Sequence, residues 1–355
     1  MQRSIKLLLF LMLVACSPGK DISRDKKIPA SGSGVDEFFD PNLKLFGQRK
    51  NSVLLILPMS GGNESVGKNT LNACLLAAED SPNIDFCVID SANPSMDKLA
   101  AYGKFGNLKA VVGPIFSHEV KRYGALFPNI PIFSLSNDLK INNDHVFACG
   151  LSLQDEIHAL FAHANSQNLD SFLIMIPEGE FGNQILEVVC SELKKYGIEE
   201  GDDLEIIRYV SISRKVATKY VKNSHKKAVF IVDPILNVSK LDAQTFTLSS
   251  VALSNPEIWD GVIFAFSDGP EQVEFMQKYR SVFGTSPKIL DMIGHDLMRI
   301  IRESIDSPKS IVGNGYHGCL GEFSIDKKNG LRRKLNIFRL ENSKKVEIDS
   351  EYDQS

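Results

Sequence analysis

The sequence lacks the motifs that mark the common enzyme classes and most nucleic-acid-binding proteins. It has no G-x-S-x-G nucleophile motif and no C-x-x-C pair. His158 and His163 are five residues apart, which is not the spacing of two metal ligands on one face of a helix. Lysine and arginine do not gather into a basic stripe, which argues against nucleic acid as a partner. We therefore predict no catalytic residues, no cofactor and no metal site.

The start of the sequence has no hydrophobic run long enough to cross a bilayer as a helix. Residues 7–14 are an apolar run of eight, which follows the basic Arg3 and Lys6 and fits the core of a signal peptide. The tetrapeptide LVAC ending at Cys16 resembles the lipobox of bacterial lipoproteins, whose cysteine is lipidated, although a free cysteine beside an ordinary cleavage site is the alternative. Ser17 rather than Asp follows, which in the lipoprotein sorting pattern favours the outer membrane. The resemblance implies a lipid-anchored protein on the periplasmic face of the outer membrane of a Gram-negative bacterium.

Cysteine is sparse in the rest of the chain. With Cys16 lipidated, five cysteines remain, and this odd number on apolar segments argues against a full disulfide framework. An exported location would still permit one or two bonds, so the pairing stays open. We expect mostly buried thiols that behave as small hydrophobic side chains. The five are Cys74, Cys87, Cys149, Cys190 and Cys319.

Residues 17–50 have too few apolar side chains to build a core. They are rich in Ser, Gly, Pro and charge, which predicts a flexible tether with a root-mean-square reach of about 30 Å. About 305 residues follow, which is enough for two α/β lobes with substantial cores. The net charge after removal of the signal peptide is about −6, since two basic residues leave with it.

Residues 53–80 predict the opening unit of a parallel α/β domain. Residues 53–57 are all apolar and fit a strand buried on both faces, and apolar residues recur at helical spacing from Leu71. Between them lies a turn that contains Pro58 and Ser60. Ligands bind to such sheets at the carboxyl ends of the strands, which is where this turn is expected to lie.

The glycines of this turn allow a second interpretation. Gly62, Gly67 and Lys68 satisfy the G-x-x-x-x-G-K pattern of a phosphate-binding loop. Asn69, however, stands where Ser or Thr would ligate Mg²⁺. The sequence separation between Asn69 and Asp90 is also short for a carboxylate that would hold the same ion. Nucleotide binding is therefore the weaker alternative for this turn.

Strand and helix patterns alternate through most of the remaining sequence, which predicts doubly wound parallel sheets of the α/β class. The pattern starts again after Gly150, which indicates a second lobe. The further strands are predicted at residues 86–89, 110–112, 130–133, 146–148, 172–176, 207–210, 228–232 and 262–266.

Several passages resemble the type I periplasmic binding proteins, the leucine-binding-protein superfamily. They are LPMSGGNESVGKNTLNACLLAAED, VVGPIFSHEV, IPIFSLSND and FMQKYRSVFGTSPKILDMIGHDLMRII. The ending GCLGEFSIDKKNGLRRKL is similar to the end of this superfamily, and most similar to the outer-membrane lipoproteins that activate penicillin-binding proteins. The resemblance covers about residues 51–345. It implies two Rossmann-like lobes, each a mostly parallel sheet flanked by helices, around a hinged cleft.

The resemblance also implies where a ligand would bind. In amino-acid-binding members, two turns hold the ligand carboxylate with hydroxyl groups and backbone N–H groups, and here they correspond to Ser117 or His118 and to Ser136 with Asp138. The amino-acid receptors usually carry Thr in place of Asp138, whose carboxylate would repel that of a ligand. Asp138 could instead cap a helix, and Glu178 could lie in a first helical turn. The candidate cleft residues are Ser60, Ser117, His118, Ser136, Asp138, Glu178, Phe181 and Asp268.

The same pattern divides the chain into segments. Lobe 1 is expected at residues 51–150 and about 284–312, and lobe 2 at residues 151–283 and about 313–345. Residues 1–16 are the signal peptide and lipobox, 17–50 the tether, and 346–355 a disordered tail. The chain is therefore expected to cross between the lobes more than once.

Two functions from different classes follow. The leading hypothesis is a non-enzymatic lipoprotein that regulates a penicillin-binding protein in peptidoglycan synthesis. The alternative is the substrate-binding receptor of an ABC transporter, which would close its lobes on an amino acid or another small polar solute. The first hypothesis predicts a protein partner, the second a small polar ligand in the cleft.

Overall fold

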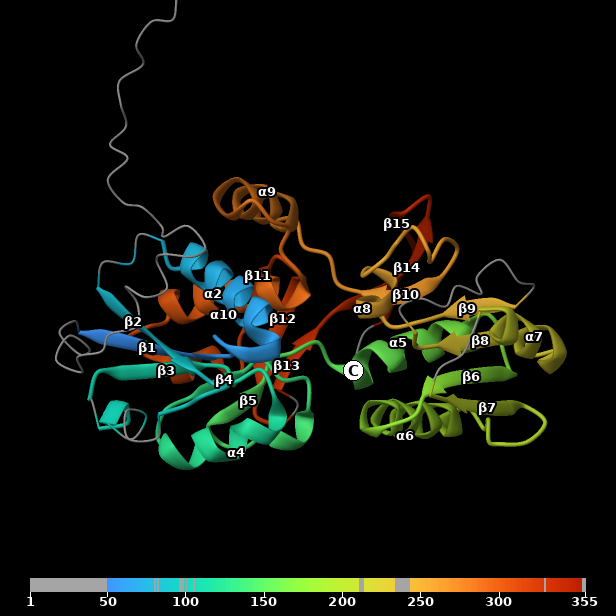
Figure 1. Cartoon of the computed structure of the whole chain (residues 1–355), viewed down its shortest axis with the longest axis horizontal. Helices are drawn as coiled ribbons and strands as arrows, with labels where there is room; N and C mark the ends of the chain where they lie inside the picture. Colours follow the sequence, from blue (N-terminus) through green and yellow to red (C-terminus); the bar gives the residue numbers. More distant parts are fainter. Residues whose placement is uncertain are drawn as a thin grey trace, which may run out of the picture.

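The computed structural model describes residues 50–352 except 80, 82, 96–98, 100, 105, 211–213, 234–242 and 329. The described elements form two lobes side by side, joined by connecting segments (Figure 1). The predicted signal peptide, the predicted lipidation site Cys16 and all but the last residue of the predicted tether lie outside the described residues. Among the helices that are described, none combines the length and apolarity needed to span a membrane.

Lobe 1 is built on a parallel sheet in the order β2-β1-β3-β4-β5. Along β1, Val53 and Leu55 join the core on one face of the sheet, and Leu54 and Ile56 join the core on the other. Both faces are therefore covered, as the continuous apolar run predicts. The strands are β1 (Asn51–Leu57), β2 (Ile84–Asp90), β3 (Leu108–Val112), β4 (Ile132–Ser134) and β5 (Val146–Ala148), and the helices that follow them include α2 (Glu64–Ala77), α4 (Ser117–Leu126) and the short η2 (Leu139–Ile141).

Helix α10 (Ile289–Glu303) packs directly on α2 (Figure 1). A Cβ atom at Gly294 would lie 3.0 Å from Thr70 Cγ2 and 3.2 Å from Cys74 Sγ, so the helices come this close only because residue 294 has no side chain. The Thr70 hydroxyl donates to Asp291 Oδ1 at 3.1 Å, and Cys74 Sγ donates to the Gly294 carbonyl at 3.5 Å. These contacts attach a late segment of the chain to lobe 1.

Lobe 2 is built on a larger sheet in the order β15-β14-β10-β9-β8-β6-β7, in which β14 and β15 are the antiparallel members. The ring of Phe161 packs against those of Phe172 and Phe230 at centroid distances of 5.2 and 5.7 Å. The strands are β6 (Phe172–Pro177), β7 (Leu204–Tyr209), β8 (Ala228–Ile231), β9 (Gln244–Phe246), β10 (Ile263–Phe266), β14 (Leu335–Glu341) and β15 (Lys344–Tyr352), with helices α5 (Leu153–Ser166), α6 (Glu180–Lys195), α7 (Arg214–Ser224) and α8 (Ser249–Ala252).

The crossings between the lobes differ from those expected. After β10 the chain returns to lobe 1 through α9 (Gln272–Phe283), where the Tyr279 hydroxyl donates to the Asn69 carbonyl of α2 at 3.1 Å. The three-stranded sheet of β11 (Gly315–Gly318), β12 (Gly321–Asp326) and β13 (Gly330–Arg333) also stays with lobe 1, because Asn142 donates to the Lys328 carbonyl at 3.0 Å. The expected return at residue 284 and the expected exit at 313 are therefore wrong. Lobe 1 holds α9 through β13, and lobe 2 resumes at β14.

The expected disordered tail at residues 346–355 is also wrong for the part that the structure describes. Strand β15 pairs antiparallel with β14 along the edge of the lobe 2 sheet. The sequence predicted disorder here because the segment is rich in charge. An edge strand can nevertheless carry charged side chains while its backbone completes the sheet.

Candidate functional site

Two cavities have four of the eight predicted cleft residues on their walls. The smaller has a volume of about 390 Å³ and opens at the carboxyl ends of β1, β2 and β3 in lobe 1. Two of the candidates predicted from sequence, Ser60 and His118, lie on its wall. Ser91, Phe116, Glu119 and Arg122 lie beside them.

The Ser60 hydroxyl is already engaged inside the protein. It donates to Asp90 Oδ2 at 2.5 Å, and the other oxygen of Asp90 accepts the backbone N–H groups of Met59 at 2.8 Å and Ala92 at 3.0 Å. Asp90 therefore fixes the turns after β1 and β2 against each other. A carboxylate ligand would find an anion at this place rather than a free hydroxyl donor.

Helix α4 contributes two polar side chains at the cavity wall and one helical turn beyond it, Glu119 and Tyr123. One carboxyl oxygen of Glu119 and the hydroxyl of Tyr123 are buried without a hydrogen-bond partner. Burial raises the pKa of Glu119, although Ser91 and His118 act in the opposite direction. Burial and then the neighbouring Glu119 raise the pKa of Tyr123 to about 12. This wall favours a neutral polar molecule or a cation over a carboxylate.

The larger cavity has a volume of about 550 Å³ and lies between the lobes. Lobe 1 contributes Asp138 and Lys140 at η2 and Arg332 of β13, and lobe 2 contributes the start of α5 and one face of α6. The predicted residue Phe181 begins that face, and its side chain is 53% exposed. We call this cavity the interlobe groove.

Most charged side chains of the interlobe groove are paired. Arg332 lies 3.2 Å from Asp155, and Lys140 lies 3.9 Å from Glu187, so both pairs join one lobe to the other. Burial raises the pKa of Asp155, and Arg332 opposes this effect. On lobe 2, Glu192 accepts from Lys195 at 2.6 Å and lies 2.7 Å from His158 Nδ1. The groove is therefore polar at its base, with an exposed aromatic ring on its wall.

In the turn after β4, Asp138 has both of the roles considered for it, a helix cap and a residue of the cleft. Its carboxylate accepts the Lys140 N–H at 3.0 Å and so caps η2, while the residue also lines the interlobe groove. The buried Ser136 hydroxyl accepts the Asp138 N–H at 3.1 Å. Another serine of this segment, Ser134, donates its hydroxyl to the Pro114 carbonyl at 2.8 Å. These hydroxyl groups hold the turn together.

The other predicted residues do not line either cavity. Ser117 is the first residue of α4, Glu178 is exposed after β6, and Asp268 forms an ion pair with Lys345. The structure thus divides the predicted cleft set between two cavities instead of gathering it at one site. Lys68 lies inside α2, 2.6 Å from Glu64, so it is part of a helical ion pair rather than of a loop around a phosphate.

Sequence reasoning missed the α4 and α6 residues of these cavities. Glu119 lines the smaller cavity and Tyr123 lies four residues further along α4, but nothing in the sequence shows that one Glu119 oxygen and the Tyr123 hydroxyl lack hydrogen-bond partners. Along α6, Phe181, Gln184 and Val188 repeat at helical spacing and form the wall of the groove. Among the described residues, the group that could hold a metal ion is His295, Asp296 and Cys319, outside both cavities.

Comparison with known proteins finds relatives of one kind at the level of sequence. The family described as LppC putative lipoprotein matches residues 41–230. The penicillin-binding protein activator LpoA of Vibrio antiquarius (strain Ex25) is 24% identical over 345 residues, which cover 81% of this chain and 57% of that protein. The chain therefore spans less than two thirds of the length of this relative.

Solved structures share the fold. A protein from Rhodospirillum rubrum described as a putative branched-chain amino acid ABC transporter aligns with a TM-score of 0.70 and 15% identity over 84% of this chain and 99% of that one. The LpoA C-domain from Haemophilus influenzae, described as a regulator of PBP1A, aligns with a TM-score of 0.63 and 17% identity over 84% of this chain and 100% of that one. The predicted type I periplasmic binding protein fold and the resemblance to the penicillin-binding-protein activators are confirmed.

Proposed function

Because the chain belongs to the LppC putative lipoprotein family, we propose that it is a non-catalytic lipoprotein that regulates a penicillin-binding protein in peptidoglycan synthesis. The 24% identity with a penicillin-binding protein activator supports this proposal. Family membership also supports anchoring to the outer membrane on its periplasmic face, with Cys16 as the lipidated residue. The tether would let the folded lobes reach about 30 Å from that surface.

The observation that carries the proposal is that the hydroxyl groups expected to bind an amino acid already form hydrogen bonds within the protein. Ser60 donates to Asp90, and Ser136 accepts from the backbone of Asp138. The carboxylates of Asp90 and Asp138 add negative charge where an amino-acid receptor would hold a carboxylate. At an effective dielectric constant near 20, two such charges about 4 Å apart repel by about 4 kcal/mol. A zwitterionic ligand would therefore lose the Ser60 hydroxyl as a donor and would meet an unfavourable potential.

We expect the panel of natural amino acids to leave the thermal unfolding temperature of the protein unchanged. A ligand present at about 100 times its dissociation constant would add about 2.7 kcal/mol of stability, which is easily measured. A clear shift with any one amino acid would contradict the regulator proposal. It would favour the transporter receptor instead.

The interlobe groove is the surface that we propose for the protein partner. It presents Phe181, half exposed, between paired charges contributed by both lobes. Exposed aromatic residues surrounded by polar groups are the usual centres of protein interfaces. A partner bound here would contact both lobes at once.

Replacement of Phe181 by Ala is expected to weaken the partner complex about tenfold, which corresponds to about 1.4 kcal/mol. The measurement uses the mature lipoprotein in detergent and each purified penicillin-binding protein of the same bacterium, with binding and peptidoglycan synthesis as readouts. Val273→Ala is the matched control, because Val273 is 63% exposed on α9 and does not line the groove.

Each outcome of this experiment has a distinct meaning. Equal loss of binding in both variants would reject the groove as the docking surface. If no penicillin-binding protein binds or changes its rate with the unmodified lipoprotein, the proposed function itself is wrong.

A further inference from the structure

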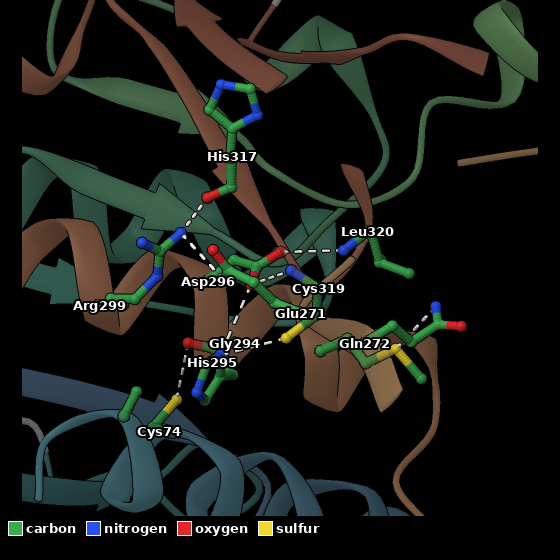
Figure 2. A network of polar contacts seen from close by, with 12 residues as sticks. Cys74, Glu271, Gln272, Gly294, His295, Asp296, Arg299, His317, Cys319 and Leu320 are labelled. Carbon is green, nitrogen blue, oxygen red and sulfur yellow. Dashed lines mark hydrogen bonds and ion pairs between the residues drawn. The ribbon is translucent and has the colours of Figure 1, made fainter. Parts of the chain in front are cut away.

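Three side chains with different metal-binding atoms lie close together in lobe 1, beside a segment that connects the two lobes. His295 and Asp296 are neighbours in α10, and Cys319 lies in the turn between β11 and β12 (Figure 2). One ligand atom from each residue lies within 4.8 Å of the others. The sequence predicted no metal site, because these residues are separated by a helix end and a strand.

The two distances from His295 Nδ1 fit tetrahedral coordination, and the ligand atoms of all three residues lie within 4.8 Å of one another. With Zn–S near 2.3 Å and Zn–N near 2.0 Å, sulfur and nitrogen ligands of tetrahedral zinc lie about 3.5 Å apart, and nitrogen and oxygen ligands about 3.4 Å apart. The observed separation of His295 Nδ1 from Cys319 Sγ is 3.4 Å, and that of His295 Nδ1 from Asp296 Oδ1 is 3.5 Å. An ion could therefore enter with only small side-chain movements.

The surroundings of the cluster hold these side chains in place. Phe275 packs on the His295 ring with the centroids 4.4 Å apart. Asp296 Oδ1 accepts the Cys319 N–H at 2.8 Å, which ties the turn to α10. A carboxylate oxygen accepts more than one partner, so Oδ1 can still bind an ion. Groups fixed in this way lose little conformational freedom when a metal binds.

The charges at the cluster suit a divalent ion. A thiolate at Cys319 and the carboxylate of Asp296 supply two negative charges to Zn²⁺, and Asp296 shares its charge with Arg333. The buried guanidinium of Arg333 lies 3.5 Å from the second oxygen of Asp296 and over the Phe323 ring at 4.8 Å, so it occupies the opposite side of the carboxylate. Sulfur with imidazole and carboxylate is a donor set for zinc and not for Mg²⁺ or Ca²⁺.

We propose that His295 Nδ1, Asp296 Oδ1 and Cys319 Sγ bind one Zn²⁺, with a water molecule as the fourth ligand. Binding replaces the thiol proton, which passes to solvent, by the metal. His295 gives the entry path, since its side chain is 16% exposed while that of Asp296 is fully buried. The ion would fasten the turn at Cys319 to α10, beside the segment that connects the lobes, where Ser267 donates to the Leu320 carbonyl at 2.5 Å. This inference does not depend on the proposed function.

The test is titration of the full mature chain, without a histidine tag and without thiol reductant, with Zn²⁺ and with Co²⁺. We expect one equivalent of either metal per chain and, with Co²⁺, the near-ultraviolet absorption of a thiolate–cobalt bond. Cys319→Ser should abolish that absorption, and His295→Asn should weaken binding by at least tenfold, which is the order of loss seen even for groups that only support a metal ligand.

Cys190→Ser is the matched control, because Cys190 is half-buried in α6, far from the cluster. It should bind both metals as the unmodified chain does. The proposal is overturned if the unmodified chain shows no thiolate–cobalt absorption, or if Cys319→Ser retains it. Thermal unfolding of each metal-free variant shows that a loss of binding does not come from misfolding.

Discussion

Replacement of Asp296 by Ala is expected to remove about 3–5 kcal/mol of folding stability, because it leaves the buried Arg333 without its anion. The side chains of Asp296 and Arg333 are 0% and 2% exposed, and they lie 3.5 Å apart. Burial alone would raise the pKa of Asp296, but His295 and Arg333 hold it below its ordinary value. The carboxylate also accepts the Cys319 N–H, so its loss leaves a buried donor without a partner.

Urea unfolding of the variant and of the unmodified chain measures this effect. The double variant Asp296→Ala with Arg333→Met should be more stable than Asp296→Ala alone, because it removes the unpaired charge. Asp296→Asn keeps an acceptor for the Cys319 N–H, so its stability should lie between those of the unmodified chain and Asp296→Ala. Should Asp296→Ala cost less than about 1 kcal/mol, the buried pair does not have the role assigned to it.

A second large effect is expected from Glu156, a buried carboxyl group of lobe 2. The hydroxyl and the backbone N–H of Ser249 both donate to Glu156 Oε1, and the distance from the N–H nitrogen is 3.3 Å. Burial raises the pKa of Glu156 from 4.5 to about 7, and the hydrogen bonds from Ser249 offset only part of this. Because the folded pKa is above the unfolded one, the stabilising contribution is complete below pH 4.5 and is lost as the pH rises through 7. The shift corresponds to about 3 kcal/mol.

Glu156→Gln should therefore leave the stability near pH 4 almost unchanged and raise it near pH 8 by up to about 3 kcal/mol. Denaturant unfolding at a series of pH values tests this. Glu199→Gln is the control, because it makes the same change of charge at a side chain that is 69% exposed. Parallel pH profiles for Glu156→Gln and the unmodified chain would mean that Glu156 titrates near its ordinary pKa.

The success of sequence reasoning differs between the fold and the candidate site. The apolar run of β1 predicted a strand buried on both faces, and the structure confirms it. The predicted cleft residues were less well placed, since Ser60 and His118 line one cavity and Asp138 and Phe181 another. Alignment locates turns at the ends of strands, but it does not show how far apart the lobes hold those turns.

The same limit explains the boundary errors. The return to lobe 1 depends on the hydrogen bond from Tyr279 to Asn69 and on the contact of Gly294 with α2, both between residues far apart in the chain. The ordered end of the chain depends on the pairing of β15 with β14. Local composition carries no signal for such contacts.

By itself, the sequence determined the α/β class, the two lobes and the resemblance to periplasmic binding proteins. The α/β class and the two lobes follow from apolar periodicity and turn residues, which act over a few neighbouring positions, and the resemblance follows from the passages similar to that family. Only the tertiary structure decided that the Ser60 hydroxyl is bound to Asp90 and that His295 meets Cys319. The physical reason is that hydrogen bonds and metal sites require atoms within a few ångströms, and the packing of whole helices and strands sets those distances.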